Sequence, residues 1–498
     1  METPEKKPKS NVVSNVLFYG FIVVGLIVLI VIISFYYYTH TQKYLLEKHI
    51  KSNSSGMKKL EGDPLPSKIK WFADAKLGLF VHYGVYSQIG SDSAEWHLEL
   101  AKPLVTDYFK NALTFNPSNF SAKYYVDHMK KFGLKYVCIT LRHHDGFTLY
   151  NQNVANSTPN WNSGASKAGT RDFIMELKKE VEANGLYFCI YHTIMDWTHK
   201  DYAVRRSYNN AYTTQPNMRN FVNYLKDSVK DSLTRYTPKM IWFDGGWESC
   251  WTADYGKELR DMIDAMKIGV IYNDRTSPNA GLSHSIRLTA EGDFQTPERI
   301  QPTTDVPREI YWETCETIGK KWGYWTEDEK ASNLKSAFQI LTIAVNSLTN
   351  NGNFLINIGP KGDGTFPAGM VTVGTQCGGF INAHEEAIFG TRKGMSMSKT
   401  YPGKSCFKFT DKEKGINNSS MFVFVANNDW ESNCTKNYSL EIPYNVVTNV
   451  SLVKTKKTVS FKQKLNTLEI LNLGPCPDVY FGVIRIDFKD PFLYVKDS

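Results

Sequence analysis

Short, continuously apolar runs alternate along the middle of the chain with stretches that repeat apolar residues every three or four positions. A parallel strand that is covered on both faces is apolar throughout, whereas a covering helix is apolar on one side. The runs therefore predict buried parallel strands, and the periodic stretches predict the helices between them. The predicted strands cover residues 79–82, 137–144, 187–192, 240–244, 270–275 and 353–359.

The predicted helices follow these strands, and most of them stop at Gly or Pro, which are typical of helix ends. Alternation of this kind predicts an α/β fold, a (β/α)8-like TIM barrel that occupies residues 68–394. The helices are expected at residues 119–132, 172–184, 218–236, 255–267 and 327–348.

Beyond residue 394 the pattern changes to short segments rich in β-branched and aromatic residues, separated by turn formers. This pattern predicts a C-terminal β-sandwich over residues 395–498, with a supporting role. Its strands are expected at residues 421–425, 439–442, 447–453, 468–471 and 479–486.

Residues 16–38 contain no charge and are long enough to cross a bilayer, which takes about 20 residues. We interpret them as a transmembrane signal-anchor, with residues 1–15 as a cytosolic tail and residues 39–67, which contain Pro64 and Pro66, as a stalk. A cleaved signal peptide is the alternative, but its apolar region is typically about 7 to 15 residues long.

Glycosylation acceptors of the type Asn-x-Ser/Thr all follow this apolar segment, which favours a type II protein with a luminal or extracellular body. Such a body lies in the secretory pathway, in a lysosome or at the cell surface. The acceptors are Asn53, Asn119, Asn156, Asn417, Asn418, Asn433, Asn437 and Asn449.

Composition narrows the classes of function. The net charge of +8 is spread along 498 residues, and no basic stretch interleaved with aromatic residues indicates a nucleic-acid partner.

The eight cysteines include no CxxC pair, so a structural zinc site is not expected. Cys138 and Cys189 fall within predicted strands as buried thiols, whereas a disulfide is expected among the C-terminal cysteines. The C-terminal cysteines are Cys406, Cys434 and Cys476, and Cys250, Cys315 and Cys377 fall in loops or unassigned segments.

Titratable and hydrogen-bonding side chains stand at the ends of the predicted barrel strands. The carboxyl ends of barrel strands open on the face where catalytic groups gather, so these side chains are expected around one opening. His82, the pair His143 and His144, Asp244 and Arg275 occupy such positions. The sequence therefore predicts an enzyme.

Several motifs at these positions resemble those of the α-L-fucosidases of glycoside hydrolase family 29, in that family's order, over roughly residues 71–392. The resemblance implies a retaining exo-glycosidase that removes terminal α-L-fucose from glycoproteins, glycolipids or oligosaccharides without a cofactor. The motifs are Trp71-Phe72-Ala73-Asp74, Phe80-Val81-His82-Tyr83-Gly84, Glu95-Trp96, His143-His144-Asp145-Gly146-Phe147, Trp242-Phe243-Asp244-Gly245, Asn273-Asp274-Arg275 and Asn353-Phe354-Leu355-Ile356-Asn357-Ile358-Gly359-Pro360.

Glycoside hydrolysis generally uses two carboxyl groups, and in retaining enzymes one of them attacks the anomeric carbon. The resemblance places the nucleophile on Asp244, although an Asp before Gly at a strand end can also serve only to stabilise a loop. Glu298 best matches the segment that supplies the acid/base, with Glu291 and Glu313 as competitors.

The histidines suit the recognition of sugar hydroxyls, since an imidazole donates from one nitrogen and accepts at the other. Three histidines from two strand ends could also hold zinc, but no HExxH helix accompanies them and the resemblance implies a metal-independent hydrolase. The resemblance assigns substrate binding to His82, Glu95, Trp96, His143, His144, Tyr191, Trp242 and Arg275. Arg275 could instead lock a loop through Asp274.

The chain departs from the family pattern at three places. Tyr191-His192-Thr193 stands where relatives often have Tyr-Tyr-Ser, Asp196 replaces a glutamate before Trp197, and Arg142 replaces a lysine before the paired histidines. We interpret these changes as flanking the sites that meet the aglycone more than those that hold fucose, so linkage preference is the property that they put in doubt.

Two alternative functions compete with the hydrolase. A fucose-binding pseudoenzyme would keep the histidine and Trp pocket and lack an acid. A type II membrane glycosyltransferase shares the anchor and stalk, but it would ordinarily show an Asp-x-Asp metal motif at a strand end. The expected partners are a fucosylated glycan and, through the N-terminal helix, a membrane; the sequence indicates no oligomeric state.

Overall fold

The structure is a computed structural model of the whole chain. It describes residues 11–53, 58–59, 65–280, 286–287, 290–302, 306–394, 402–409, 419–434, 437–442, 445–464, 467–489 and 493–494. The predicted cytosolic tail up to residue 10 and the acceptors Asn417 and Asn418 lie outside these residues.

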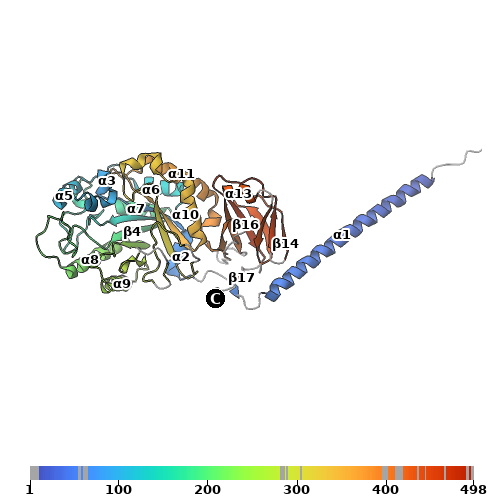
Figure 1. The fold of residues 1–498 in the computed structure, drawn as a ribbon, viewed down its shortest axis with the longest axis horizontal. Coiled ribbons are helices and arrows are strands. Elements are labelled where there is room, and N and C mark those ends of the chain that lie inside the picture. Colours follow the sequence, from blue (N-terminus) through green and yellow to red (C-terminus); the bar gives the residue numbers. More distant parts are fainter. Residues whose placement is uncertain are drawn as a thin grey trace, which may run out of the picture.

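A parallel, curved sheet of seven strands forms the centre of the larger domain, in the order β6-β5-β4-β3-β2-β8-β7 (Figure 1). Nearly every residue of these strands is buried, which explains their continuous apolar character. The strands are β2 (Leu77–Val81), β3 (Tyr136–Arg142), β4 (Tyr187–Thr193), β5 (Met240–Asp244), β6 (Ile271–Tyr272), β7 (Trp312–Thr317) and β8 (Gly352–Ile358).

An extended segment at residues 293–298 lies between β6 and β7 and closes the barrel. Phe294 bridges Asn273 beyond β6, and Glu298 bridges Cys315 on β7, both in parallel. The backbone N–H of Glu313 donates to the carbonyl of Gln295 at 2.8 Å, which adds a ladder bond on the β7 side. The expected eighth strand position is therefore occupied, and the predicted (β/α) barrel is confirmed.

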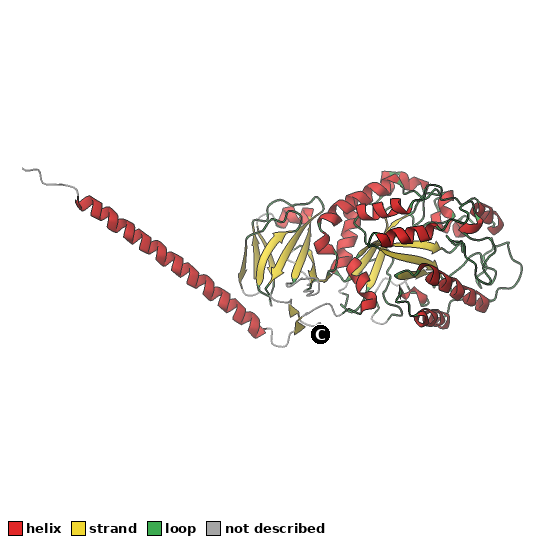
Figure 2. Ribbon diagram, turned by 180° about the vertical axis from the view of Figure 1, so that it is seen from behind, coloured by secondary structure: helices red, strands yellow, loops and turns green. Residues whose placement is uncertain are grey.

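Helices surround this barrel (Figures 1 and 2). The longer ones are α2 (Ser67–Ala75), α5 (Val105–Leu113), α6 (Ala122–Lys131), α7 (Phe173–Ala183), α8 (Met218–Tyr236), α9 (Ala253–Met266), α10 (Ala337–Thr349) and α11 (Ala368–Ala383). Side chains cap five of their N-termini, namely Ser121, Asp172, Asn217, Thr252 and Ser336. The short helices are α3 (Tyr86–Ile89), α4 (His97–Leu100) and α12 (Glu385–Ile388), with 3-10 turns η1 (Ala94–Trp96), η2 (Ser163–Ala165), η3 (Asp274–Thr276), η4 (Thr326–Glu329) and η5 (Ala331–Asn333).

Three details of the barrel prediction were wrong. The single helix expected at residues 327–348 is two 3-10 turns followed by α10, because Ser336 forms a capping box with Gln339 and starts a new helix there. The run at 270–275 is a two-residue strand followed by η3. Cys315, which was expected in a loop or an unassigned segment, lies buried in β7, a strand that the sequence pattern did not predict.

The C-terminal region contains two antiparallel sheets, ordered β13-β16-β11-β10-β9 and β12-β15-β14. Alternate residues of β11 face different cores: Phe422 and Phe424 join the core of the barrel, while Met421 and Val423 join the core between the two sheets. The strands are β9 (Arg392–Lys393), β10 (Lys404–Lys408), β11 (Ser420–Ala426), β12 (Asn437–Glu441), β13 (Val447–Leu452), β14 (Phe461–Lys464), β15 (Thr467–Leu471) and β16 (Phe481–Phe488). A short helix, α13 (Asn427–Asn433), was not predicted.

All eight cysteines are free thiols in the structure, so the disulfide expected among Cys406, Cys434 and Cys476 is not formed there. Cys406 and Cys434 are buried, as are Cys138 and Cys189 in their barrel strands.

The N-terminal helix α1 spans Asn11–Asn53 and extends away from the rest of the molecule (Figure 1). Its segment Phe18–Tyr38 is long and apolar enough to cross a bilayer, by length and composition alone, and among the described residues no other helix meets this test. The helix continues through the first part of the expected stalk, and β1 (Lys58–Lys59) pairs with β17 (Leu493–Tyr494).

Candidate active site

A pocket opens at the carboxyl ends of the barrel strands. The space between its walls measures about 370 Å³ when the open solvent at its mouth is included. Its lining combines side chains of β2, β4, β5 and β7 with residues that follow β2, β3, β5 and β7 and with Glu298 of the closing segment. The lining residues are Phe80, His82, Trp96, His143, His144, Tyr191, Trp242, Asp244, Trp247, Glu298, Cys315 and Trp322.

Asp244 ends β5 and is held from two directions. Arg275 donates from Nη1 to Oδ1 at 2.7 Å, and the Tyr191 hydroxyl donates to Oδ2 at 3.0 Å. The following residue, Gly245, has a φ of +89°, and a Cβ there would lie 3.1 Å from the backbone nitrogen of Met195. The turn after Asp244 therefore requires glycine, and the carboxylate is fixed while 12% of its side chain remains exposed.

Glu298 stands on the segment that closes the barrel, and its side chain is 36% exposed at the pocket. Its Oε2 lies 3.2 Å from Arg275 Nη1, the same nitrogen that contacts Asp244 at 2.7 Å. These two distances bound the separation of the two carboxylate oxygens at 5.9 Å. The structure thus brings the two predicted carboxyl groups together beside one buried guanidinium.

The two competing glutamates lie elsewhere. The Glu291 side chain is 62% exposed and pairs with Arg260 at 3.0 Å. Glu313 is buried inside the barrel, where it accepts hydrogen bonds from Trp242 Nε1 and from the Tyr136 hydroxyl, and burial raises its pKa to about 8. Neither residue lines the pocket.

His82, His143 and His144 all line the pocket, as expected. Burial lowers the pKa of each, to about 3 for His82 and His144, so all three imidazoles are neutral at physiological pH. Among the residues that the structure describes, no group of three or more His, Cys, Asp or Glu side chains is arranged to hold a metal ion.

Aromatic rings form the remaining walls. Trp242 packs against Tyr191, with ring centroids 5.6 Å apart, and lies under the Arg275 guanidinium at 4.5 Å. Trp247 and Trp322, which the sequence patterns did not predict, complete the walls. Trp247 lies nearly parallel to Trp96 at 6.5 Å. Its position three residues after Asp244 was a usable signal, whereas Trp322 follows a strand that was not predicted.

Two predicted substrate-binding residues act behind the surface of the pocket. Glu95 is 5% exposed and accepts a hydrogen bond from the backbone of Gly323 at 2.8 Å, next to Trp322. Burial raises its pKa to about 7. Arg275 is also buried, and it reaches the site through Asp244 and Glu298 rather than by lining the pocket.

Two of the departures from the family pattern contact each other. Arg142 and Asp196 form an ion pair and are 0% and 1% exposed. Asp196 also accepts hydrogen bonds from the Thr198 hydroxyl at 2.9 Å and from the His199 backbone at 3.0 Å. Side chains buried to this extent do not line the pocket, and the expected effect of the departures on linkage preference stays a prediction. The two residues are a structural pair behind His144.

A (β/α) barrel whose C-terminal face holds two carboxyl groups beside neutral histidines and Trp walls has the architecture of a glycoside hydrolase. The sequence matches the family model described as Alpha-L-fucosidase over residues 45–386. The chain belongs to the α-L-fucosidase family, and it is an enzyme that hydrolyses α-L-fucosides.

Individual relatives agree with this assignment. The chain is 28% identical to an alpha-L-fucosidase of Dictyostelium discoideum over 71% of its own length and 78% of the relative's. It is 28% identical to human tissue alpha-L-fucosidase, covering 67% of this chain and 71% of that one. It resembles the solved structure of alpha-L-fucosidase isoenzyme 1 from Paenibacillus thiaminolyticus, with a TM-score of 0.72, 25% identity and coverage of 85% and 99% of the two chains.

Proposed function

We propose that the enzyme removes terminal α-L-fucose with retention of configuration, with Asp244 as nucleophile and Glu298 as acid/base. The observation that carries this proposal is the shared contact of both carboxylates with Arg275 Nη1, which bounds their separation at 5.9 Å. Retaining glycosidases hold their carboxyl groups about 5 to 5.5 Å apart, whereas inverting enzymes need about 6.5 to 9.5 Å to admit a water.

The reaction proceeds in two displacements. An oxygen of Asp244 forms a bond to the anomeric carbon while the bond to the aglycone oxygen breaks, and Glu298 gives its proton to that oxygen. Water then loses a proton to Glu298 and displaces Asp244 from the sugar, which restores both carboxyl groups. Tyr191 and Arg275 hold the attacking group in place between the two steps.

Two solved structures of other fucosidases are consistent with this chemistry. One is a family 29 alpha-L-fucosidase from Bacteroides thetaiotaomicron trapped as a covalent intermediate with 2-fluoro-fucosyl fluoride. Another is an alpha-fucosidase from Thermotoga maritima in complex with fucose. The pocket suits the same sugar, because its neutral histidines face hydroxyl groups and its rings offer an apolar wall to the methyl group of a 6-deoxy sugar.

Replacement of the acid/base tests the assignment. With an aryl α-L-fucoside that has a good leaving group, Glu298→Ala slows the second displacement, and added azide restores turnover and yields a fucosyl azide. Glu291→Gln, which changes an exposed side chain outside the pocket, serves as the matched control and keeps wild-type kinetics. Unchanged kinetics in Glu298→Ala would contradict the role of Glu298.

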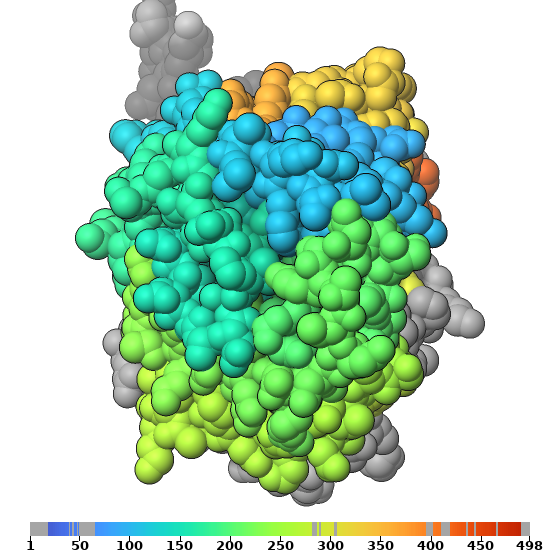
Figure 3. All heavy atoms as spheres, turned by 90° about the vertical axis from the view of Figure 1, so that its left-hand side faces the viewer, coloured from blue at the N-terminus to red at the C-terminus, as the bar shows by residue number. Residues whose placement is uncertain are grey.

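The substrate class is a terminal fucose on a glycoprotein, glycolipid or oligosaccharide. Four Trp rings line the pocket, and Asp244 and Glu298 both line it as well. Its mouth lies among the loops that follow the barrel strands, some of which form the face shown in Figure 3. The aglycone therefore leaves toward solvent, as exo-cleavage requires.

We further propose that α1 anchors the enzyme in a membrane as a type II protein with its body in the lumen or outside the cell. The described side chains of Phe18–Tyr38 are exposed, with none packed against the body. Asn119, Asn156 and Asn433 are exposed acceptors on the body. Carbonate-resistant membrane association together with a mobility shift on glycan removal is expected. Release of a soluble, shortened chain would identify a cleaved signal peptide instead.

A further inference from the structure

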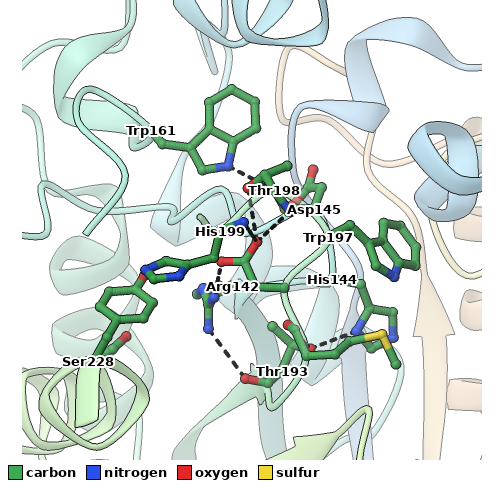
Figure 4. Close-up of polar contacts among 12 residues, drawn as sticks. Arg142, His144, Asp145, Trp161, Thr193, Trp197, Thr198, His199 and Ser228 are labelled. Atoms are coloured by element: carbon green, nitrogen blue, oxygen red, sulfur yellow. Dashed lines mark hydrogen bonds and ion pairs between the residues drawn. The ribbon is translucent and has the colours of Figure 1, made fainter. Parts of the chain in front are cut away.

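The pocket histidines carry their protons on defined nitrogens. His144 Nδ1 lies 2.6 Å from the hydroxyl oxygen of Thr193 (Figure 4). That hydroxyl donates its single hydrogen to the buried carbonyl of Met195 at 3.0 Å. The Thr193 oxygen can therefore only accept from His144, so Nδ1 of His144 carries the proton.

His82 is fixed in the same tautomer by an amide. Its Nδ1 lies 2.7 Å from Oδ1 of Asn357. The Nδ2 group of Asn357 donates to the carbonyl of Trp322 at 2.7 Å, and a carbonyl can only accept, so this contact sets which end of the amide faces each partner. The amide oxygen therefore accepts from Nδ1–H of His82.

Both imidazoles are neutral, because burial lowers their pKa to about 3, with neighbouring arginines adding to the effect at His144. With the proton on Nδ1, each ring leaves a bare lone pair on Nε2. In His144 this nitrogen lies 3.6 Å from Oδ2 of Asp244, so two acceptors face each other. A hydrogen-bond donor from the ligand is needed there.

We propose that Thr193 and Asn357 are positioning residues that hold His144 and His82 as hydrogen-bond acceptors, so that the pocket requires two donating hydroxyls of the sugar. The inference rests on the proposed fucose site and adds its selectivity. His143 differs, because its buried Nδ1 has no hydrogen-bond partner among the described residues. No described partner therefore fixes the tautomer of His143.

The opposite tautomer of His144 has a structural cost. A proton on Nε2 would have to reach Asp244 across 3.6 Å, beyond ordinary hydrogen-bond length. The Thr193 hydroxyl would then turn to Nδ1, and the buried Met195 carbonyl would lose this donor. Buried carbonyls without a donor are rare because the loss of such a bond is expensive.

Inhibition by sugar analogues tests the proposal in the full chain in detergent. The inhibition constant of L-fucose is compared with those of analogues in which one ring hydroxyl at a time is replaced by fluorine or by hydrogen. Fluorine accepts weakly and does not donate. At two ring positions we expect fluorine and hydrogen to weaken inhibition equally, by about tenfold, which corresponds to one lost hydrogen bond in each case.

Variants assign each position to its histidine. Thr193→Val should reduce the fluorine penalty at one position to less than about twofold, Thr193→Ser should restore it, and Asn357→Leu should remove the penalty at the other position. Ser228→Ala is the control, since Ser228 contacts His192 Nε2 at 3.0 Å and lies outside the pocket. It should keep the wild-type pattern.

Fluorine analogues that inhibit as strongly as L-fucose at every position would overturn the proposal, as would a Thr193→Val enzyme that keeps both penalties. If the variants fail to fold, the wild-type pattern alone decides. Failure of the proposed function gives a different result, because the product would then emerge with inverted configuration or Glu298→Ala would keep wild-type kinetics, while the inhibitor pattern could still be measured by competition for binding.

Discussion

Glu313→Gln should make the stability of the barrel less dependent on pH. Glu313 is 1% exposed, and it accepts hydrogen bonds from Trp242 Nε1 at 3.1 Å and from the Tyr136 hydroxyl. No cation contacts it among the described residues, and burial raises its pKa from 4.5 to about 8. The carboxyl group is therefore protonated in the folded protein over a range where it is ionised in the unfolded chain.

The sign follows from which state binds more protons. Between about pH 4.5 and 8 the folded state keeps the proton of Glu313 and the unfolded state releases it, so the free energy of unfolding falls as the pH rises. The slope is about 1.4 kcal/mol per pH unit, which amounts to about 5 kcal/mol over the whole interval. Glutamine is neutral at every pH and has a similar shape, so it removes this contribution.

Urea unfolding monitored by Trp fluorescence at pH 5 and pH 7 provides the measurement. The wild-type protein should lose about 3 kcal/mol more than Glu313→Gln between these two pH values. Glu327→Gln, which changes a surface residue paired with Lys330, is the control and should keep the wild-type dependence. An equal pH dependence of the free energy of unfolding in the wild type and in Glu313→Gln would show that Glu313 does not contribute to it.

Further predictions concern the ion pair and the walls of the pocket. Arg142→Lys or Asp196→Glu alone should lower the free energy of unfolding by about 3 kcal/mol, because each variant disturbs a buried ion pair. The double variant should recover most of this loss, and strictly additive losses in thermal unfolding would contradict the coupling of the two residues. Trp322→Ala should raise KM for an aryl fucoside about tenfold, because the ring packs 5.3 Å from His82 at the pocket, while Trp325→Ala should not. Equal KM values in the two Trp variants would contradict this.

The barrel could be predicted because its strands are buried on both faces and are therefore marked by uninterrupted apolar runs. Strand β7, with the sequence Trp-Glu-Thr-Cys-Glu-Thr, broke that rule, since Glu313 is buried through hydrogen bonds and Glu316 through ion pairs with Arg299 and Lys335. Buried polar residues of this kind leave no trace in a hydropathy pattern.

The site could be predicted as far as its residues lie at strand ends. Asp244 and the three histidines fall there, whereas Glu298 stands on the irregular segment that replaces a strand, so its place beside Arg275 depends on tertiary contacts. The coupling of Arg142 with Asp196 was also hidden, because the two residues are far apart in sequence and meet only in the folded barrel.

The central claim is that Asp244 forms a covalent bond to fucose. The most direct measurement is to treat the enzyme with a 2-fluoro-fucosyl fluoride and map the trapped adduct by mass spectrometry of its peptides. We expect one adduct, on Asp244, with loss of activity in proportion to labelling. An adduct on any other residue, or complete inactivation without an adduct, would contradict it.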